Sequence, residues 1–187
     1  MKKKKELYND SWLYILLLTT LVILIEALKN YTFILNNVSI TYSIFLLPLV
    51  YLLTNYITKK YTYQRSIVAI SISGVSVVLF TILMNFALGK EITLMNISGQ
   101  FCAYVVSQFI NLTIYNFLLN NTKPTYILIF QNYLFTLIIF YMFYTLINLN
   151  ILVIDEYWTG YFTVVSIQTF MCLILAFIDK KIKRGIE

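Results

Sequence analysis

Six long apolar segments fill most of this 187-residue chain, and they limit the folds that it can adopt. They cover residues 12–28, 40–57, 66–88, 99–119, 126–147 and 158–178. A helix that crosses a bilayer needs about 20 mostly apolar residues, and each segment comes near that length. Backbone N–H and C=O groups in hydrocarbon must be paired internally, which favours helices. We therefore predict an all-α, polytopic integral membrane protein, with residues 1–187 forming a single domain that is a compact bundle of six transmembrane helices.

The composition agrees with a chain that contacts lipid over most of its length. Hydrophobic residues make up 60% of the sequence and charged residues 12%, with a mean hydropathy of +0.79. Soluble chains carry about 25% charged residues, so a soluble helical protein would need a polar surface that this sequence lacks. The formal net charge of +6 comes from residues at the ends of the apolar segments. We expect a lipid bilayer as the partner of this charge, and no nucleic acid.

The basic residues alternate between successive connections. Twelve of the 14 Lys and Arg residues lie before the first segment, after the last, or in the second and fourth connections. The remaining two, Lys29 and Lys90, lie in the first and third connections. Because cytoplasmic loops carry the excess of Lys and Arg, both termini are predicted to be cytoplasmic. An even number of crossings gives the same answer.

Two further patterns concern helix shape and packing. Pro48 falls inside the second segment, where a missing backbone donor predicts a kink. Pro124 precedes the fifth segment, a position that proline tolerates well. The third segment carries a series of small residues, which let helices approach closely in lipid. They are Ser66, Ala69, Ser71, Ser73, Gly74 and Ser76.

An enzyme is not predicted. The chain has no histidine and no glycine-rich phosphate loop, so no motif for a metal or another cofactor is present. Glu26 is the one acidic residue that lies clearly within a segment, and it precedes Lys29 by three residues. That spacing allows an ion pair on one helix face, and we expect such a pair near the membrane interface. A converging pair of reactive groups, as intramembrane catalysis needs, is not visible.

Polar side chains inside the segments form the candidate site. Tyr104, Gln108, Asn111 and Tyr115 follow one helical face, and Tyr51, Asn55 and Thr58 follow another. Gln131, Asn132 and Gln168 are the other amides within the segments. Amides are costly in hydrocarbon unless they are hydrogen-bonded, so they should face the bundle interior. They could tie helices together, or they could line a pocket for a flat polar solute.

The second and fourth segments resemble signature sequences of a transporter family. Pro48-Leu49-Val50-Tyr51-Leu52-Leu53-Thr54-Asn55 is similar to P-L-x-Y-L-L-T-D, and Ala103-Tyr104-Val105-Val106-Ser107-Gln108-Phe109-Ile110-Asn111 is similar to A-Y-x-x-S-Q-x-x-D. These are patterns of the VUT family of vitamin uptake transporters, also called queuosine precursor transporters. The similarity covers most of the chain in order and hydropathy, and it is sharp only in these two segments.

Most departures from the family pattern affect charge, and one does not: Thr62 stands where the family has glycine. Asn55 and Asn111 stand where the family has aspartate, Lys59 where it has glutamate, and Gln131 where it has arginine. An asparagine keeps its hydrogen-bonding capacity but cannot carry a proton. The resemblance therefore implies a related fold with a pocket of neutral amides.

Together these patterns predict a transporter in the bacterial inner membrane that takes up a small heterocyclic solute, either a deazapurine precursor of queuosine or a vitamin. The predicted solute-binding residues are Tyr51, Asn55, Tyr104, Gln108, Asn111 and Gln131. Two alternatives remain: a substrate-binding component of an energy-coupling-factor vitamin transporter, and a membrane scaffold or assembly protein that transports nothing. The sequence leaves open whether a second copy or a membrane partner subunit is bound.

Overall fold

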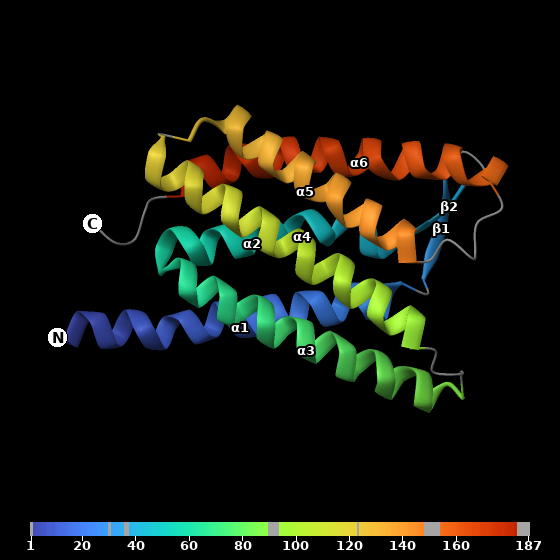
Figure 1. The fold of residues 1–187 in the computed structure, drawn as a ribbon, viewed down its shortest axis with the longest axis horizontal. Coiled ribbons are helices and arrows are strands. Elements are labelled where there is room, and N and C mark those ends of the chain that lie inside the picture. The colour runs from blue at the N-terminus through green and yellow to red at the C-terminus, as the bar shows by residue number, and fades with distance from the viewer. Residues whose placement is uncertain are drawn as a thin grey trace.

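Six α-helices and one β-hairpin make up the computed structural model of the chain (Figure 1). The structure describes residues 2–29, 31–35, 38–89, 94–122, 124–147 and 154–182. The helices are α1 (Lys2–Leu28), α2 (Leu47–Lys60), α3 (Tyr63–Ala87), α4 (Leu94–Asn121), α5 (Tyr126–Ile147) and α6 (Ile154–Lys181). The hairpin, β1 (Thr32–Leu35) and β2 (Val38–Thr41), leads into a short 3-10 helix, η1 (Tyr42–Phe45).

Five of the six helices are long and apolar enough to cross a membrane. The spanning stretches are Asp10–Leu28, Tyr63–Ala87, Phe101–Asn121, Tyr126–Phe143 and Phe162–Lys181. The fold is thus that of a multi-pass membrane protein, as the apolar segments predict. The fifth predicted segment has the bounds of α5, and the first, fourth and sixth extend by several residues into polar sequence.

The second predicted span, residues 40–57, was wrong in its first part. Residues before Leu47 form β2 and η1, and α2 has 14 residues. At 1.5 Å per residue, α2 is about 21 Å long, shorter than the hydrocarbon thickness of about 30 Å. Pro48 lies in the first turn of α2, where it removes no helical hydrogen bond, so the predicted kink is also wrong. The segment that precedes η1 and α2 suits a strand, because it contains the β-branched residues Val38, Ile40 and Thr41.

The short helix α2 lies at the centre of the bundle. It contacts all five other helices, and nine of its 14 residues are buried. A helix wrapped by protein can carry polar side chains, because they find partners that lipid does not offer. The central position of α2 therefore explains why it is both shorter and more polar than the five spanning helices.

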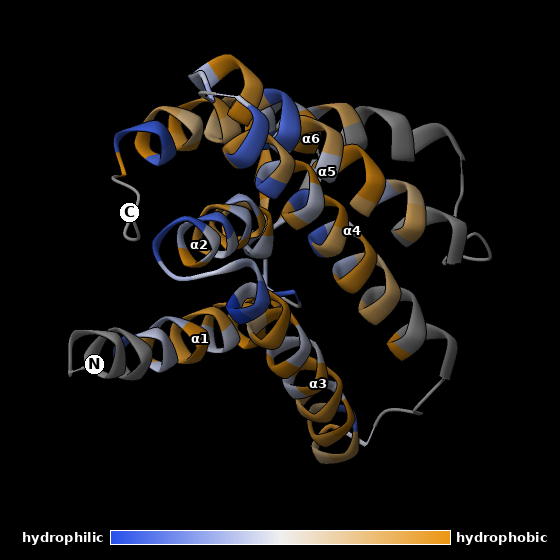
Figure 2. Cartoon of the chain, turned by 60° about the vertical axis from the view of Figure 1, so that its left-hand side comes forward, coloured by the Kyte–Doolittle hydropathy of each residue, from blue (hydrophilic) through white to orange (hydrophobic). Residues whose placement is uncertain are grey.

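Successive helices run in opposite directions, so that the start of α1 and the end of α6 lie at the same end of the bundle (Figure 1). We call this the basic end. The described cationic residues Lys59, Lys60, Arg65, Lys180 and Lys181 lie there, and Lys29 lies at the opposite end. Figure 2 shows the hydrophilic colour at the junction of α2 with α3 and at the end of α6. Lys90, Lys123, Lys183 and Arg184 are outside the described residues.

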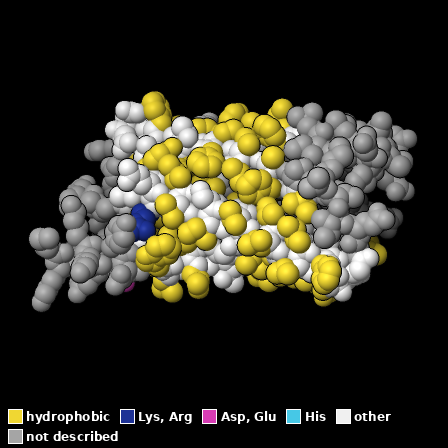
Figure 3. Space-filling view, turned by 60° about the horizontal axis from the view of Figure 1, so that its bottom comes forward, with side chains coloured by type: hydrophobic (Ala, Val, Ile, Leu, Met, Phe, Trp, Pro, Cys, Tyr) yellow, Lys and Arg dark blue, Asp and Glu magenta, His cyan; other side chains and the backbone are white. Residues whose placement is uncertain are grey.

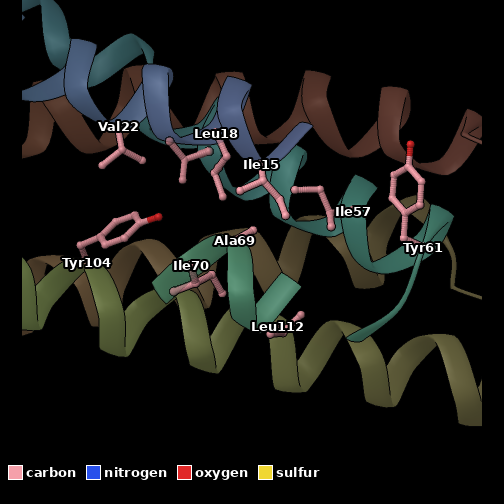
Figure 4. Close-up of a cluster of buried hydrophobic side chains, with 10 residues drawn as sticks. Ile15, Leu18, Val22, Ile57, Tyr61, Ala69, Ile70, Tyr104 and Leu112 are labelled. Carbon is pink, nitrogen blue, oxygen red and sulfur yellow. The ribbon is translucent and has the colours of Figure 1, made fainter. Parts of the chain in front are cut away.

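A hydrophobic cluster joins α1, α2, α3 and α4 (Figure 4). Its members include Ile15, Leu18, Val22, Ile57, Ala69, Ile70 and Leu112. Small residues of α3 pack inside the bundle. Ser66, Ala69, Ser73 and Gly74 are buried, whereas Ser71 is exposed. Packing was therefore the correct interpretation for four residues of the stripe.

The outer surface matches a lipid environment. Large hydrophobic side chains such as Leu13, Leu83 and Phe86 are exposed, and hydrophobic side chains are spread over the described part of the face in Figure 3. The expected pair of Glu26 and Lys29 is confirmed, with Lys29 Nζ 3.6 Å from Glu26 Oε1.

Candidate polar site around α2

The polar faces predicted on α2 and α4 meet inside the bundle. Tyr51, Asn55, Gln108 and Asn111 each have 0% of their surface exposed. Asn111 Nδ2 donates a hydrogen bond of 3.0 Å to Asn55 Oδ1. The inward orientation of both faces is therefore confirmed. Figure 1 shows α2 lying behind α4 at this level of the bundle.

Three asparagines form a hydrogen-bonded row across three helices. Asn132 Nδ2 of α5 donates a hydrogen bond of 2.7 Å to Asn111 Oδ1 of α4. Asn111 Nδ2 in turn donates to Asn55 Oδ1 of α2. Asn55 Nδ2 continues the row at 3.3 Å to Asp179 Oδ2 of α6. The side chains of the row are buried, so each hydrogen bond replaces one that the group would make with water. The row links four helices through side chains alone.

Three hydrogen-bonding atoms near this row lack a partner in the described part of the chain: two lie one helical turn before the row on α2 and α4, and the third belongs to Asn132 of the row itself. Thr54 Oγ1 donates to Gln108 Oε1 at 3.0 Å, but Gln108 Nε2 has no partner among the described residues. The same is true of the Tyr51 hydroxyl and of Asn132 Oδ1. The Ser107 hydroxyl, which donates 3.0 Å to the Tyr104 carbonyl, is the nearest side-chain neighbour of the Tyr51 hydroxyl. We call Gln108, Tyr51 and Asn132 the open polar triad.

Tyr51, one member of the triad, stacks on a second tyrosine ring. The rings of Tyr51 and Tyr133 are stacked, with centroids 6.3 Å apart and an interplanar angle of 26°. Tyr133 directly follows Asn132 on α5. Leaving a buried polar atom unsatisfied costs about 1–3 kcal/mol, so three such atoms on α2, α4 and α5 are an unusual feature of a buried interior.

Asp179 is the main feature that the sequence analysis missed. Its side chain is completely buried near the end of α6. Tyr115 of α4 donates 2.6 Å to Oδ1, and Tyr133 of α5 donates 2.7 Å to Oδ2. With Asn55, three uncharged donors from three helices satisfy the carboxylate.

Lys59 supplies the opposite charge. Its Nζ lies 3.5 Å from Asp179 Oδ1, and it donates 2.7 Å to the backbone carbonyl of Asp179. The second contact caps a carbonyl in the last turn of α6, where the helix dipole favours a cation. An ion pair in low dielectric is tolerated only with good geometry and further hydrogen bonds, both of which are present here. We refer to Lys59, Asp179, Tyr115 and Tyr133 as the charged cluster.

At the other side of the triad, Gln168 of α6 is also buried. It donates 3.0 Å to the carbonyl of Ile44 in η1 and accepts 2.7 Å from the Tyr141 hydroxyl. Buried polar groups thus run along the interior from the charged cluster at the basic end to η1. Tyr51 of the open polar triad lies on α2 between η1 and Asn55.

Two of the six predicted binding residues lie elsewhere. Tyr104 is buried, but its hydroxyl is 2.6 Å from that of Ser73 on α3, and its ring belongs to the cluster of Figure 4. Gln131 is exposed on the outer face of α5. The adjacent Asn132, which was noted among the amides but not predicted to bind, is the residue of α5 that faces inward.

Comparison with known proteins gives no family assignment, since no family model, no curated protein and no solved structure matches this chain.

Proposed function

We propose that the protein is a transporter for a small, neutral heterocyclic solute, and that the open polar triad is part of its binding pocket. The supporting observation is the set of three buried atoms without a partner, contributed by α2, α4 and α5. A protein that used its amides only to join helices would gain nothing from leaving these atoms unpaired. A solute that paired with them would recover that free energy on binding.

The chemistry of the open atoms favours the edge of a ring system. Gln108 Nε2 can donate, Asn132 Oδ1 can accept, and the Tyr51 hydroxyl can do either. Heterocycles of the deazapurine or vitamin type carry donors and acceptors along one edge, and aromatic rings such as those of Tyr51 and Tyr133 suit their faces. Asp179 is already neutralised by Lys59, so we expect no net charge on the solute.

The orientation in the membrane belongs to the same proposal. We place both termini in the cytoplasm and the protein in a bacterial inner membrane, with α2 and η1 together forming the sixth crossing. Their combined length is about 29 Å, using about 1.5 Å per α-helical and 2.0 Å per 3-10 residue. The cationic residues at the basic end support this orientation.

The direct test is a thermal-shift screen of purified protein with purine-like bases, deazapurines and vitamins. A ligand that binds only the folded state stabilises it by RT ln(1 + [L]/Kd), about 2.7 kcal/mol at a concentration of 100 Kd. We expect at least one solute to raise the unfolding temperature of the parent protein. If none does, the scaffold alternative replaces this proposal.

Two glutamine variants locate the site of any solute found. Gln108→Leu removes an open donor, and Thr54 still bonds the Val50 carbonyl at 2.9 Å, so the variant should fold. We expect its Kd to rise about 5- to 150-fold, the equivalent of about 1–3 kcal/mol. Gln131→Leu, on the exposed face of α5, is the matched control and should bind like the parent. Equal binding by the parent and both variants would place the pocket elsewhere.

A further inference from the structure

A second cluster, separate from the polar interior, surrounds Lys60 at the basic end. The Lys60 ammonium lies 5.3, 5.2 and 5.8 Å from the ring centroids of Tyr14, Tyr56 and Tyr61. Cation–π attraction at such distances holds the charge in place. Close by in sequence, the Arg65 guanidinium lies 5.5 Å from the Trp12 ring. The side-chain cations of Lys60 and Arg65 thus both contact aromatic rings, which belong to α1, α2 and the connection between α2 and α3.

The hydrogen bonds of this cluster leave donors available at one end. Lys60 Nζ donates 2.7 Å to the Tyr56 hydroxyl, which donates 3.0 Å to the Tyr14 hydroxyl. The Tyr14 hydroxyl therefore accepts one hydrogen bond, and its own hydrogen has no acceptor among the described residues. Two of the three Lys60 hydrogens are likewise available. The cluster presents a short chain of donors that starts at the Lys60 ammonium and ends at the Tyr14 hydroxyl.

Among the described residues Lys60 forms no ion pair; the ion pairs found among them are Glu26–Lys29 and Lys59–Asp179. The Asp10 carboxylate, one helical turn before Tyr14 on α1, lies near Tyr61 of the same cluster and is exposed. The hydrogen bond to Tyr56 raises the pKa of Lys60, so the side chain stays cationic at neutral pH. The hydroxyl of Tyr61, a residue that is 6% exposed, also lacks a hydrogen-bond partner among the described residues. The positive charge of Lys60 and the free hydrogens of Lys60 and Tyr14 both favour an anionic hydrogen-bond acceptor at this site.

The position of the cluster identifies the kind of acceptor. Trp12 and Tyr14 lie near the start of the apolar part of α1, where tryptophan and tyrosine sit at the headgroup level of a bilayer. Leu17 and Leu24 continue the Tyr14 side of α1 and are 49% and 43% exposed. A phosphate at Lys60 would therefore carry its acyl chains along an exposed apolar face.

We propose that Lys60, Tyr14 and Tyr56 form a binding site for the phosphate headgroup of an anionic phospholipid in the leaflet at the basic end. The phosphate oxygens accept from Lys60 Nζ and from the Tyr14 hydroxyl, and the acyl chains pack against α1. A zwitterionic lipid also carries a phosphate, but its own cation opposes Lys60. The site is independent of the proposed transport function.

Tryptophan fluorescence provides the test, because the chain has only two tryptophans. A Trp158→Phe variant retains Trp12, which lies beside the proposed site. The variant is placed in phosphatidylcholine vesicles containing increasing fractions of brominated phosphatidylglycerol or brominated phosphatidylcholine. We expect half-maximal quenching at a roughly fivefold lower fraction of the brominated anionic lipid, the effect of one cation near the membrane surface.

Matched variants decide whether Lys60 is responsible. Lys60→Gln should remove most of the preference. Tyr14→Phe, which deletes the terminal donor and the acceptor of the Tyr56 hydroxyl, should reduce it. Lys29→Gln removes a cation at the opposite end of the bundle and should leave the preference unchanged. Equal quenching by both lipids in the parent, or a preference that survives both Lys60→Gln and Tyr14→Phe, would overturn the proposal. Loss of the preference on adding soluble glycerophosphate would also overturn it, since the site would then bind a soluble anion.

Discussion

Asp179 shows what a single residue needs in order to be charged inside a membrane protein. Isolated burial of a carboxylate costs several kcal/mol even after relaxation. Here Lys59 supplies the counter-charge, and Asn55, Tyr115 and Tyr133 donate to the two carboxylate oxygens. Removing the charge from either partner should leave the other buried and uncompensated. The cluster is therefore more informative when both charges are removed together.

A double-mutant cycle measures this dependence. We expect Lys59→Met and Asp179→Asn, taken singly, each to lower the free energy of unfolding by about 3 kcal/mol, because each leaves one buried charge unpaired. The double variant should lose less than either single variant, since no charge remains and the asparagine oxygen can still accept from a tyrosine. Chemical unfolding in detergent gives the free energies. Strictly additive losses would show that the two side chains do not interact as the 3.5 Å separation indicates.

Residue-level prediction from the sequence succeeded for most of the amides, was wrong for Gln131, which is exposed, and failed for the carboxylate of Asp179. The cost of amides in lipid was enough to orient Gln108 and Asn111 inward. Asp179 lies one residue beyond the sixth predicted segment, residues 158–178, so the hydropathy pattern gave no reason to expect its burial. Its spacing from Gln168 and Cys172 is 11 and seven residues, which places all three on one helical face. The sequence could not predict that Lys59 is the ion-pair partner of Asp179, because the packing of α2 against α6 is a contact between segments far apart in the chain.

At the scale of elements, the second apolar segment shows why hydropathy alone gives imperfect boundaries. The amino acids of residues 40–46 are apolar enough for a span, but Pro48 begins a helix there instead of interrupting one. The strand pair before it is antiparallel, with Thr32 opposite Thr41 and Leu35 opposite Val38. The five long segments were predicted well because a lipid-facing helix must be apolar throughout. The length of α2 is set by the helices around it, which a single sequence does not display.

The contact between α3 and α4 depends on Gly74. A Cβ atom built on Gly74 would lie 3.1 Å from Phe101 Cε2 and 3.3 Å from Val105 Cγ2. Overpacking of such a contact typically costs about 1–3 kcal/mol. We therefore expect Gly74→Val to lower the free energy of unfolding by that amount, measured by chemical unfolding in detergent.

Ser71, three residues earlier on α3, is the matched control. It is exposed on the outer face, so Ser71→Val should change the free energy of unfolding by less than about 0.5 kcal/mol. A Gly74→Val variant as stable as the parent would mean that α3 and α4 are less closely packed than the two distances require.

For the whole molecule, the alternating helix directions and the distribution of cations together predict six crossings with both termini in the cytoplasm. Three helices, α2, α3 and α4, separate Tyr31 from Thr122, and both residues are exposed. If α2 with η1 crosses the membrane, the two positions lie on opposite sides. In a chain with Cys102 and Cys172 replaced, Tyr31→Cys should react with an impermeant maleimide in intact cells, and Thr122→Cys only after permeabilisation.

Each other labelling pattern has a definite meaning. Reaction of Thr122→Cys alone in intact cells would reverse the orientation. Reaction of both positions from the same side would show that α2 does not cross, and the bundle would then have five crossings. The positive-inside rule predicts an orientation from loop charges alone, whereas the number of crossings depends on how a short helix is packed.

The central claim is that the polar interior around α2 carries a solute across the membrane. Counterflow tests it without knowledge of the energy source: proteoliposomes loaded with an unlabelled solute from the thermal screen are given the labelled form outside. We predict labelled uptake well above that of empty liposomes for the parent and for Gln131→Leu, and a loss of at least about fivefold for Gln108→Leu. A solute that binds the parent yet exchanges no faster than in empty liposomes would contradict transport and leave a binding component or a scaffold.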